Sequence, residues 1–161
     1  MKQKVILPPS TNPRIPEPEA PFYHELPLQI RFTDIDMLGH MNNGVYLTMM
    51  DLGKTHYFND VLGEKVDWHK INVAVVNINV NFYAATFLTD TISVVTRVTA
   101  MSKHSLTLEQ RIIETTTGEV KCMARTIMAG YDIKTASSLP IDPVWFERIS
   151  RWEETDFEMP Q

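Results

Sequence analysis

The 161-residue chain has one cysteine, Cys122, and no long apolar run. A single cysteine excludes an internal disulfide and a metal site built from several thiolates. The apolar runs fall far short of the ~18 residues that a membrane-spanning helix needs. Pro8 and Pro9 interrupt the apolar N-terminal stretch that a signal peptide would require. We therefore expect a cytoplasmic protein with no membrane partner.

Basic residues are also sparse, and no run of five lysines or arginines occurs. The formal net charge is −5. A protein that tracks nucleic-acid phosphates usually carries a basic stripe, so we expect no nucleic-acid partner. His24, His56 and His69 show no metal-ligand spacing with one another or with acidic residues. We expect no metal and no cofactor.

Prolines recur among polar residues from Pro8 to Pro21. This composition is typical of an extended segment, and we expect residues 1–25 to form a proline-rich arm. The remainder has the length and the apolar content of one globular domain, which we place at residues 26–161.

The apolar pattern predicts one strand, one long helix, four strands and a C-terminal helix. Residues alternate with period two over 27–33 and again over 76–82, as in a strand. From Asn42 or Asn43, either of which can cap a helix, apolar residues recur at helical spacing as far as Phe58. Gly53 lies inside this helix, where glycine is unfavourable, so we expect it to mark a close approach to a sheet. Further strands are expected over 90–100, 105–117 and 120–133, and the last helix within 139–152.

This order predicts an α+β fold with one helix against an antiparallel sheet. Its most informative feature is the turn between the first strand and the helix. Asp34 and Asp36 end the strand, and a Gly39-His40-x-Asn42-Asn43 turn leads into the helix. A helix N-terminus offers unpaired N–H groups and a partial positive charge, which stabilise a carbonyl oxygen that becomes negative. A carboxylate facing that end can activate water or attack directly.

The run Asp34-x-Asp36-x-x-Gly39-His40-x-Asn42-Asn43-x-x-Tyr46 in this setting resembles the hotdog-fold acyl-CoA thioesterases, specifically the 4-hydroxybenzoyl-CoA thioesterase-like family. The resemblance implies a five-stranded antiparallel sheet wrapped around one long central helix. It also implies a homodimer joined edge to edge through the strand at about residues 72–83. Such dimers can pair again into a homotetramer.

The resemblance assigns roles to residues of the turn. Asp36 matches the catalytic carboxylate, and Asn43 matches the residue whose backbone N–H polarises the thioester carbonyl. Gly39 matches the glycine that permits the tight entry to the helix. His40 lines the acyl pocket, hydrogen-bonds the thioester region, or packs within its loop; we count it among the catalytic candidates.

Other residues are expected to bind substrate. Asn42 and Tyr46 belong to the same run, and Asn42 caps the helix or makes an interface contact. Lys103 and His104, followed by Ser105, fall where the related aromatic-CoA enzymes place basic residues near the CoA phosphates. CoA or phosphopantetheine would therefore enter as part of the substrate.

Two further carboxylates are candidates for a role in the site. Asp34 is expected to bind loop amides and to orient Asp36. Asp51 is the alternative catalytic residue, because another hotdog branch draws its carboxylate from the helix. It lies eight residues beyond Asn43, or about 12 Å along the axis, which is far for one carbonyl within one protomer.

We therefore predict a thioester hydrolase that acts on acyl-CoA or acyl-carrier-protein thioesters. Asp36 serves as general base or nucleophile, and the Asn43 amide donates to the oxyanion. The sequence leaves two alternatives open. One is a hotdog hydratase or dehydratase that uses His40 with Asp36. The other is a non-catalytic module that binds acyl thioesters.

Overall fold

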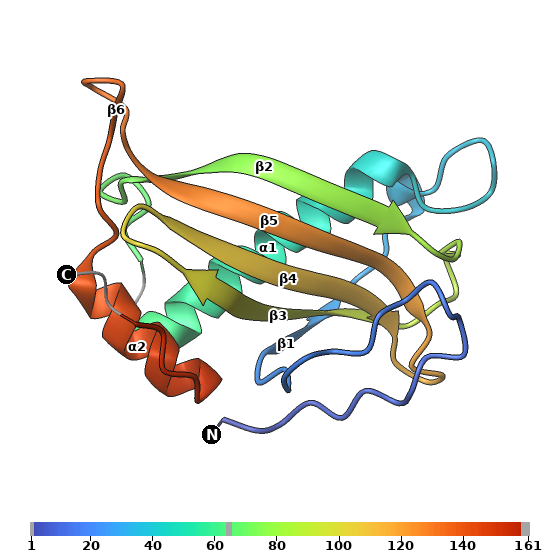
Figure 1. Ribbon diagram of the computed structural model, residues 1–161. Helices are drawn as coiled ribbons and strands as arrows, with labels where there is room; N and C mark the ends of the chain where they lie inside the picture. The colour runs from blue at the N-terminus through green and yellow to red at the C-terminus, as the bar shows by residue number, and fades with distance from the viewer. Residues whose placement is uncertain (1, 64–65, 159–161) are drawn as a thin grey trace.

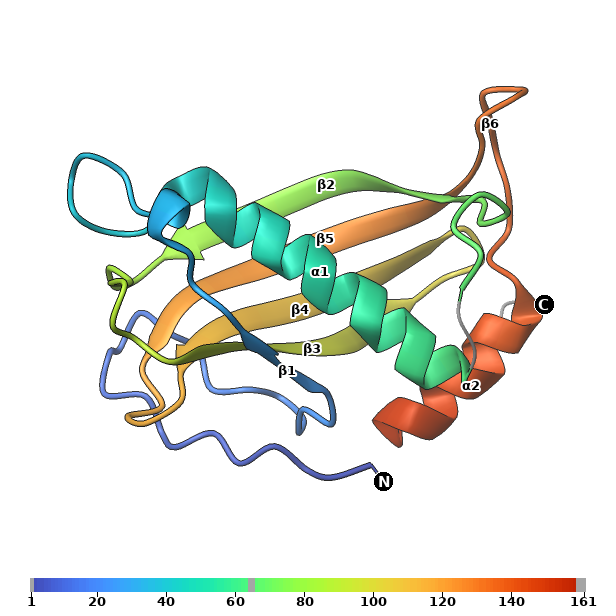
Figure 2. The same ribbon diagram turned by 180° about the vertical axis from the view of Figure 1, so that it is seen from behind.

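One antiparallel sheet curves around a single long helix in the computed structural model, which describes residues 2–63 and 66–158 (Figures 1 and 2). The strand order is β1-β3-β4-β5-β2, and a two-residue strand β6 pairs with the end of β5. The strands are β1 (Glu25–Leu28), β2 (Val73–Phe82), β3 (Ile92–Met101), β4 (Ser105–Glu114), β5 (Val120–Asp132) and β6 (Ser137–Ser138). The predicted α+β hotdog fold is confirmed.

Helix α1 spans Asn43–Leu62 and lies across the concave face of the sheet (Figure 2). Its N-cap is Asn42, one of the two predicted candidates, and it runs four residues past Phe58 before Gly63 ends it in the left-handed conformation (φ 71°). A Cβ added at Gly53 would lie 2.7 Å from Cγ1 of Val94 on β3. Gly53 therefore marks the predicted close approach of helix and sheet.

The first strand differs from its prediction. A strand was expected over 27–33, but β1 ends at Leu28 and Phe32–Asp34 form a 3-10 turn. The cause is Asp34, whose carboxylate accepts hydrogen bonds from the Arg31 backbone N–H at 2.8 Å and from its guanidinium at 3.0 Å. These bonds close the turn, which the alternation of apolar residues does not reveal.

Residues 2–24 contain no helix or strand beyond one isolated bridge between Val5 and Phe22, and they lie over the sheet face opposite α1 (Figure 1). Ile15 and Phe22 are buried there against Val95, Ile113 and Val120. The Arg97 guanidinium donates to the Ala20 carbonyl at 3.2 Å. The predicted arm thus packs on the outer face of the sheet. Its separation from the domain at residue 25 stays a prediction.

Helix α2 (Pro143–Glu153) lies at the C-terminal end of α1. Asp142 caps it by accepting the Val144 N–H at 2.9 Å. Its buried residues Phe146 and Ile149 join a core cluster with Tyr57 and Phe58 of α1. Neither helix of the described residues has the length and apolar content to cross a membrane.

Candidate active site

The loop that carries Asp36 is a closed turn before α1. The Asp36 N–H donates to the His40 carbonyl at 3.1 Å, and the Gly39 N–H donates back to the Asp36 carbonyl at 3.0 Å. Gly39 has a φ of 83°, a region that favours glycine, which explains the residue type at this position. One carboxylate oxygen of Asp36 accepts the Leu38 N–H at 2.9 Å. The half-buried Asp36 side chain is therefore held in a defined place.

Asn42 joins this loop to the helix. Its side-chain oxygen accepts the Gly44 N–H at 2.8 Å, and its side-chain amide donates to Oδ2 of Asp36 at 3.4 Å. The next backbone N–H, that of Asn43, has no acceptor within the described residues. The Asp36 carboxylate and an unpaired amide thus lie at the same helix end, where the helix dipole is positive.

Asp34 is buried beside the loop and bonds to it. Its side chain is 2% exposed, and its carbonyl accepts the Asn42 N–H at 2.9 Å. Burial alone would raise the pKa of Asp34, but the hydrogen bonds and charge of Arg31 outweigh it and hold this pKa below its ordinary value. Asp34 is therefore ionised and holds the turn at Arg31. Its predicted orientation of Asp36 stays a prediction.

Tyr46 ties α1 to the end of β2. Its hydroxyl donates to Oγ1 of Thr86 at 2.8 Å, and its ring packs edge-on against Phe82 at 5.3 Å. The Thr86 carbonyl also accepts the Met41 N–H at 2.8 Å. Tyr46 is 2% exposed in the single chain, so it is part of the packing beside the start of α1. Its contact with substrate stays a prediction.

Comparison with known proteins shows the family of the chain. The sequence profile of the Thioesterase-like superfamily matches residues 30–152. The chain belongs to this superfamily.

Individual relatives agree with this assignment. The long-chain acyl-CoA thioesterase FadM of Escherichia coli is 24% identical over 127 residues, which cover 77% of this chain and 95% of FadM. A Thermus thermophilus thioesterase, solved with coenzyme A and zinc, has 25% identity and a TM-score of 0.73 over 83% of this chain and 96% of its own. A Staphylococcus aureus DHNA-CoA thioesterase has 23% identity and a TM-score of 0.68, over 80% of this chain and 89% of its own. The predicted hotdog thioester hydrolase is confirmed.

Within this thioesterase, exposed apolar side chains occur in the Asp36 loop, just before it and in the β2–β3 connection. Phe32, Met37 and Leu38 are 82%, 98% and 73% exposed, and Phe87 and Leu88 of the β2–β3 connection are also exposed. Sequence reasoning missed these residues, because it attended to the carboxylates between them. An exposed apolar group of this kind is typical of a surface that a ligand or partner covers.

The described residues show no contact that gives His40 or Asp51 a catalytic role. His40 ends the loop with its side chain half-buried, and its carbonyl closes the turn. Asp51 is exposed on α1 and pairs with Lys54 at 2.7 Å. It lies two turns from Asn43, as its position in the sequence implies. Their catalytic roles stay predictions.

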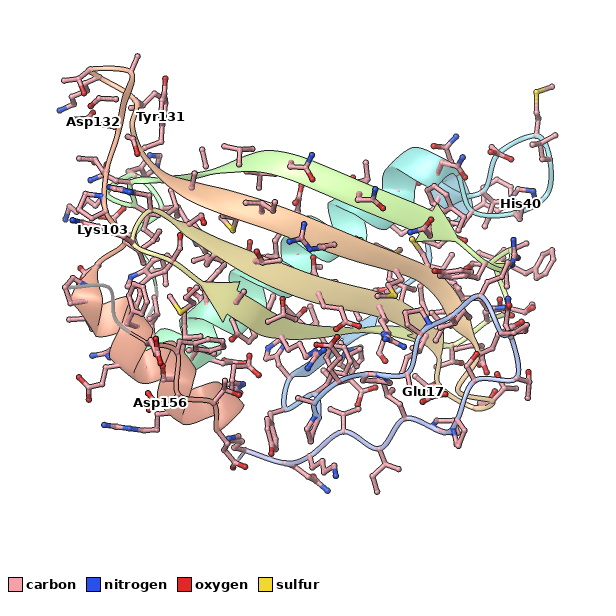
Figure 3. The ribbon with its side chains drawn as sticks, viewed as in Figure 1. Glu17, His40, Lys103, Tyr131, Asp132 and Asp156 are labelled. Atoms are coloured by element: carbon pink, nitrogen blue, oxygen red, sulfur yellow. The ribbon has the colours of Figure 1, made fainter. Side chains whose placement is uncertain are left out.

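The predicted CoA-binding residues lie elsewhere in the single chain. Lys103 and His104 belong to the β3–β4 turn and Ser105 begins β4. Lys103 lies at the opposite end of the sheet from His40 (Figure 3). The His104 carbonyl accepts the Gly130 N–H at 2.8 Å, and Ser105 exchanges hydrogen bonds with Ser102. One protomer therefore does not bring these three residues to Asp36.

The single cysteine is poorly suited to act as a nucleophile. Cys122 is buried among the residues that pack below α1. Burial raises the pKa of its thiol to about 12, so the thiolate nucleophile is scarce at neutral pH.

Proposed function

We propose that this thioesterase hydrolyses acyl-CoA or acyl-carrier-protein thioesters, with Asp36 as the acting carboxylate and the Asn43 N–H as oxyanion donor. The observation that carries the proposal is the link through Asn42, which bonds the Asp36 carboxylate and caps the helix whose next amide has no acceptor among the described residues. The names of FadM and of the structural relatives support acyl-CoA as the substrate class.

The chemistry follows from this arrangement. The thioester carbonyl oxygen accepts the Asn43 N–H, and the developing negative charge faces the positive helix end. Water attacks the carbonyl carbon while Asp36 accepts its proton, and the leaving thiolate takes up the proton that Asp36 holds. A general base contributes ~10²–10⁴ in rate. One oxyanion donor contributes about 2.7–4 kcal/mol.

Asp36 can instead attack the carbonyl carbon itself and form an anhydride that water then opens. In a single turnover in ¹⁸O-labelled water, label on Asp36 identifies this covalent route. Attack by Asp36 followed by water at the Asp36 carbonyl leaves the label on Asp36, and direct attack by water leaves it only in the acid product.

We further propose that the active unit is a dimer joined along β2. This strand is the last in the sheet order, and Val76 and Ile78 on it are exposed. Its first residue, Val73, pairs with Gly130 beside the β3–β4 turn, and its last residue, Phe82, contacts Tyr46 beside the Asp36 loop. An antiparallel pairing of β2 with itself would therefore bring residues 103–105 of a second protomer toward Asp36 of the first.

The test is release of free thiol from a panel of acyl-CoA and acyl-carrier-protein substrates, measured for wild type and Asp36→Ala. We expect the variant to keep its fold and to lose at least ~10² in rate. Asp51→Ala is the matched control and should retain activity. Full activity of Asp36→Ala would exclude Asp36 as the acting carboxylate, and loss only in Asp51→Ala would move the role to the helix carboxylate.

A further inference from the structure

The loop that carries Asp36 is bonded to the rest of the protein at Thr86, in the connection between β2 and β3. The Thr86 carbonyl accepts the Met41 N–H at 2.8 Å, and both residues are fully buried. Within the described residues, no other hydrogen bond joins residues 35–41 to a residue outside 32–42. The place of this loop beside the start of α1 therefore depends on Thr86 as well as on the chain itself.

Met41 lies between the two residues that bond Asp36. The His40 carbonyl accepts the Asp36 N–H at 3.1 Å, and the Asn42 side-chain amide donates to the Asp36 carboxylate at 3.4 Å. A shift of the Met41 backbone would move both partners, because each is joined to it by one planar peptide unit. Asp36 would then move relative to the helix end.

Thr86 is also bonded to α1 through its side chain. Its Oγ1 accepts the Tyr46 hydroxyl at 2.8 Å, and Tyr46 is 2% exposed. Tyr46 lies three positions after Asn43, the first residue of the helix, and so belongs to the first turn. Thr86 therefore joins the loop, through its carbonyl, to the first turn of α1, through its hydroxyl.

The segment that contains Thr86 is itself held by Lys121 of β5, which is 5% exposed. The Lys121 ammonium donates to the Ala85 carbonyl at 3.0 Å. Its backbone carbonyl accepts the N–H groups of Tyr83 and Ala84 at 2.9 and 3.2 Å. These bonds fix the backbone just before Thr86 against the sheet, so Thr86 provides a fixed point for the loop.

We propose that Thr86 is a positioning residue for thioester hydrolysis, which holds the Asp36 carboxylate at the start of α1. The inference rests on the proposed function of Asp36 and deepens it. The Thr86 carbonyl fixes the loop through Met41, and its hydroxyl fixes the same residue to the helix through Tyr46. A thioester must meet the carboxylate and the Asn43 N–H at once, and a misplacement of about 1 Å can cost ~10²-fold in rate.

The test is a comparison of kcat and KM for thiol release from an acyl-CoA. Thr86→Val keeps the shape of the side chain and removes the hydroxyl, and kcat should fall ~10–10²-fold while KM changes little. Thr86→Ser keeps the hydroxyl and should recover most of the activity. Tyr46→Phe should lose as much as Thr86→Val, and the double variant no more than either, because the two hydroxyls act as one pair.

A second readout separates positioning from a general loss of structure. Thr86 acts through Asp36 in this proposal, so Thr86→Val should cause no further loss of kcat when it is added to Asp36→Ala. A variant that only loosens the fold would lower the remaining activity by the same factor in both backgrounds. Thermal unfolding of each variant shows that the protein assayed is folded.

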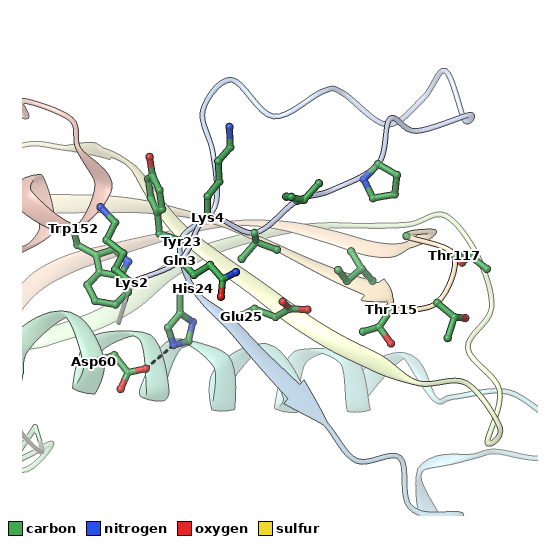
Figure 4. Close-up of a pocket in the computed structure, with 16 residues that line it drawn as sticks. Lys2, Gln3, Lys4, Tyr23, His24, Glu25, Asp60, Thr115, Thr117 and Trp152 are labelled. Carbon is green, nitrogen blue, oxygen red and sulfur yellow. Dashed lines mark hydrogen bonds and ion pairs between the residues drawn. The ribbon is translucent and has the colours of Figure 1, made fainter.

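Two control variants remove comparable bonds away from the loop. Thr96→Val removes a buried hydroxyl that accepts the Gln110 side-chain N–H at 3.0 Å. Asp60→Ala removes the partner of His24 near the other end of α1, beside a cavity of about 1070 Å³ that the N-terminal arm lines (Figure 4). We expect both variants to change stability without changing kcat.

Four results would overturn the proposal: wild-type kcat in Thr86→Val, an equal fall of kcat in Thr96→Val, a further fall when Thr86→Val is added to Asp36→Ala, or a loss in Tyr46→Phe alone, which would assign that hydroxyl to the substrate. Full activity of Asp36→Ala would overturn the proposed function together with this inference. A loss in Asp36→Ala with wild-type kcat in Thr86→Val would overturn this inference only.

Discussion

The Asn42 side chain bonds two partners at once: its amide donates to the Asp36 carboxylate at 3.4 Å, and its oxygen accepts the Gly44 N–H at 2.8 Å. The proposed catalytic acid and the start of α1 are therefore joined through one residue. A change at Asn42 should affect both stability and turnover.

Asn42→Ala removes both bonds. Loss of the helix cap should reduce the free energy of unfolding by about 1 kcal/mol. Turnover should fall too, because the Asp36 carboxylate loses one of the two hydrogen bonds that it accepts. Asn42→Asp is the matched control: it keeps the cap but places a second carboxylate beside Asp36. Urea unfolding and thiol-release assays check both effects, and unchanged turnover in both variants would separate Asn42 from the chemistry.

Asn43→Pro tests the oxyanion donor directly. Proline is favoured at the first helical position, and Asn42 has φ −63° and ψ 140°, which a following proline accepts. The variant should fold normally and lose about 10²–10³ in kcat, because the proposed donor is gone. Asn43→Ala keeps the N–H and should remain active. Equal activity of the two variants would mean that another group binds the oxyanion.

Gly53→Ala should destabilise the fold although alanine favours helices. Its Cβ would meet Val94 at 2.7 Å and the Gln110 amide nitrogen at 3.1 Å. Overpacking of this kind costs ~1–3 kcal/mol, whereas helix propensity returns about 1. Adding Val94→Ala should recover part of the loss. Thermal unfolding of the single and double variants measures the coupling, and a stabilised Gly53→Ala would contradict the close packing.

Glu114 makes stability depend on acid pH. Its Oε2 accepts hydrogen bonds from the hydroxyls of Thr116 at 2.6 Å and Thr117 at 2.9 Å, and from both backbone N–H groups. The Thr116 hydroxyl, followed by the Thr117 bonds, lowers the pKa of Glu114 from 4.5 to about 2 despite burial. The unfolded chain therefore binds this proton first as pH falls. The stabilisation is complete above pH 4.5 and is lost toward pH 2.

Glu114→Gln should be less stable than wild type at pH 7 and should lose less stability between pH 4.5 and 2. Urea midpoints at pH 7, 4.5 and 3 provide the measurement. Glu147→Gln, on the exposed face of α2, is the control. Parallel pH profiles of wild type and Glu114→Gln would show that the turn does not depend on this carboxylate.

Local sequence patterns predicted most of the fold. Asn42, Gly53 and the alternating strands each act over a few residues, so their signals are visible in the chain itself. The Arg31–Asp34 turn was missed because a short apolar alternation runs through it. Contacts between distant segments were also invisible: the ring of His24, just before β1, packs near that of Trp152 on α2, far along the chain.

The candidate site was predictable to a different degree. The sequence placed Asp36 beside the start of α1, because only five residues lie between it and Asn42. It gave no sign that Lys103–Ser105 would lie at the far end of the sheet, since that separation depends on the length and direction of the strands. The exposure of Phe32, Met37 and Leu38 was also missed, because it depends on how far the loop extends from the protein, which residue types do not predict.

The cover that the N-terminal residues place on the sheet has a practical consequence. A chain shortened to begin at β1 would bare Val95, Ile113 and Val120, and would leave the Arg97 guanidinium without the Ala20 carbonyl. Such a protein should be poorly soluble and should stick to itself through the wrong face. Oligomers seen after trimming would then report the damage, so assembly studies need the intact N-terminus.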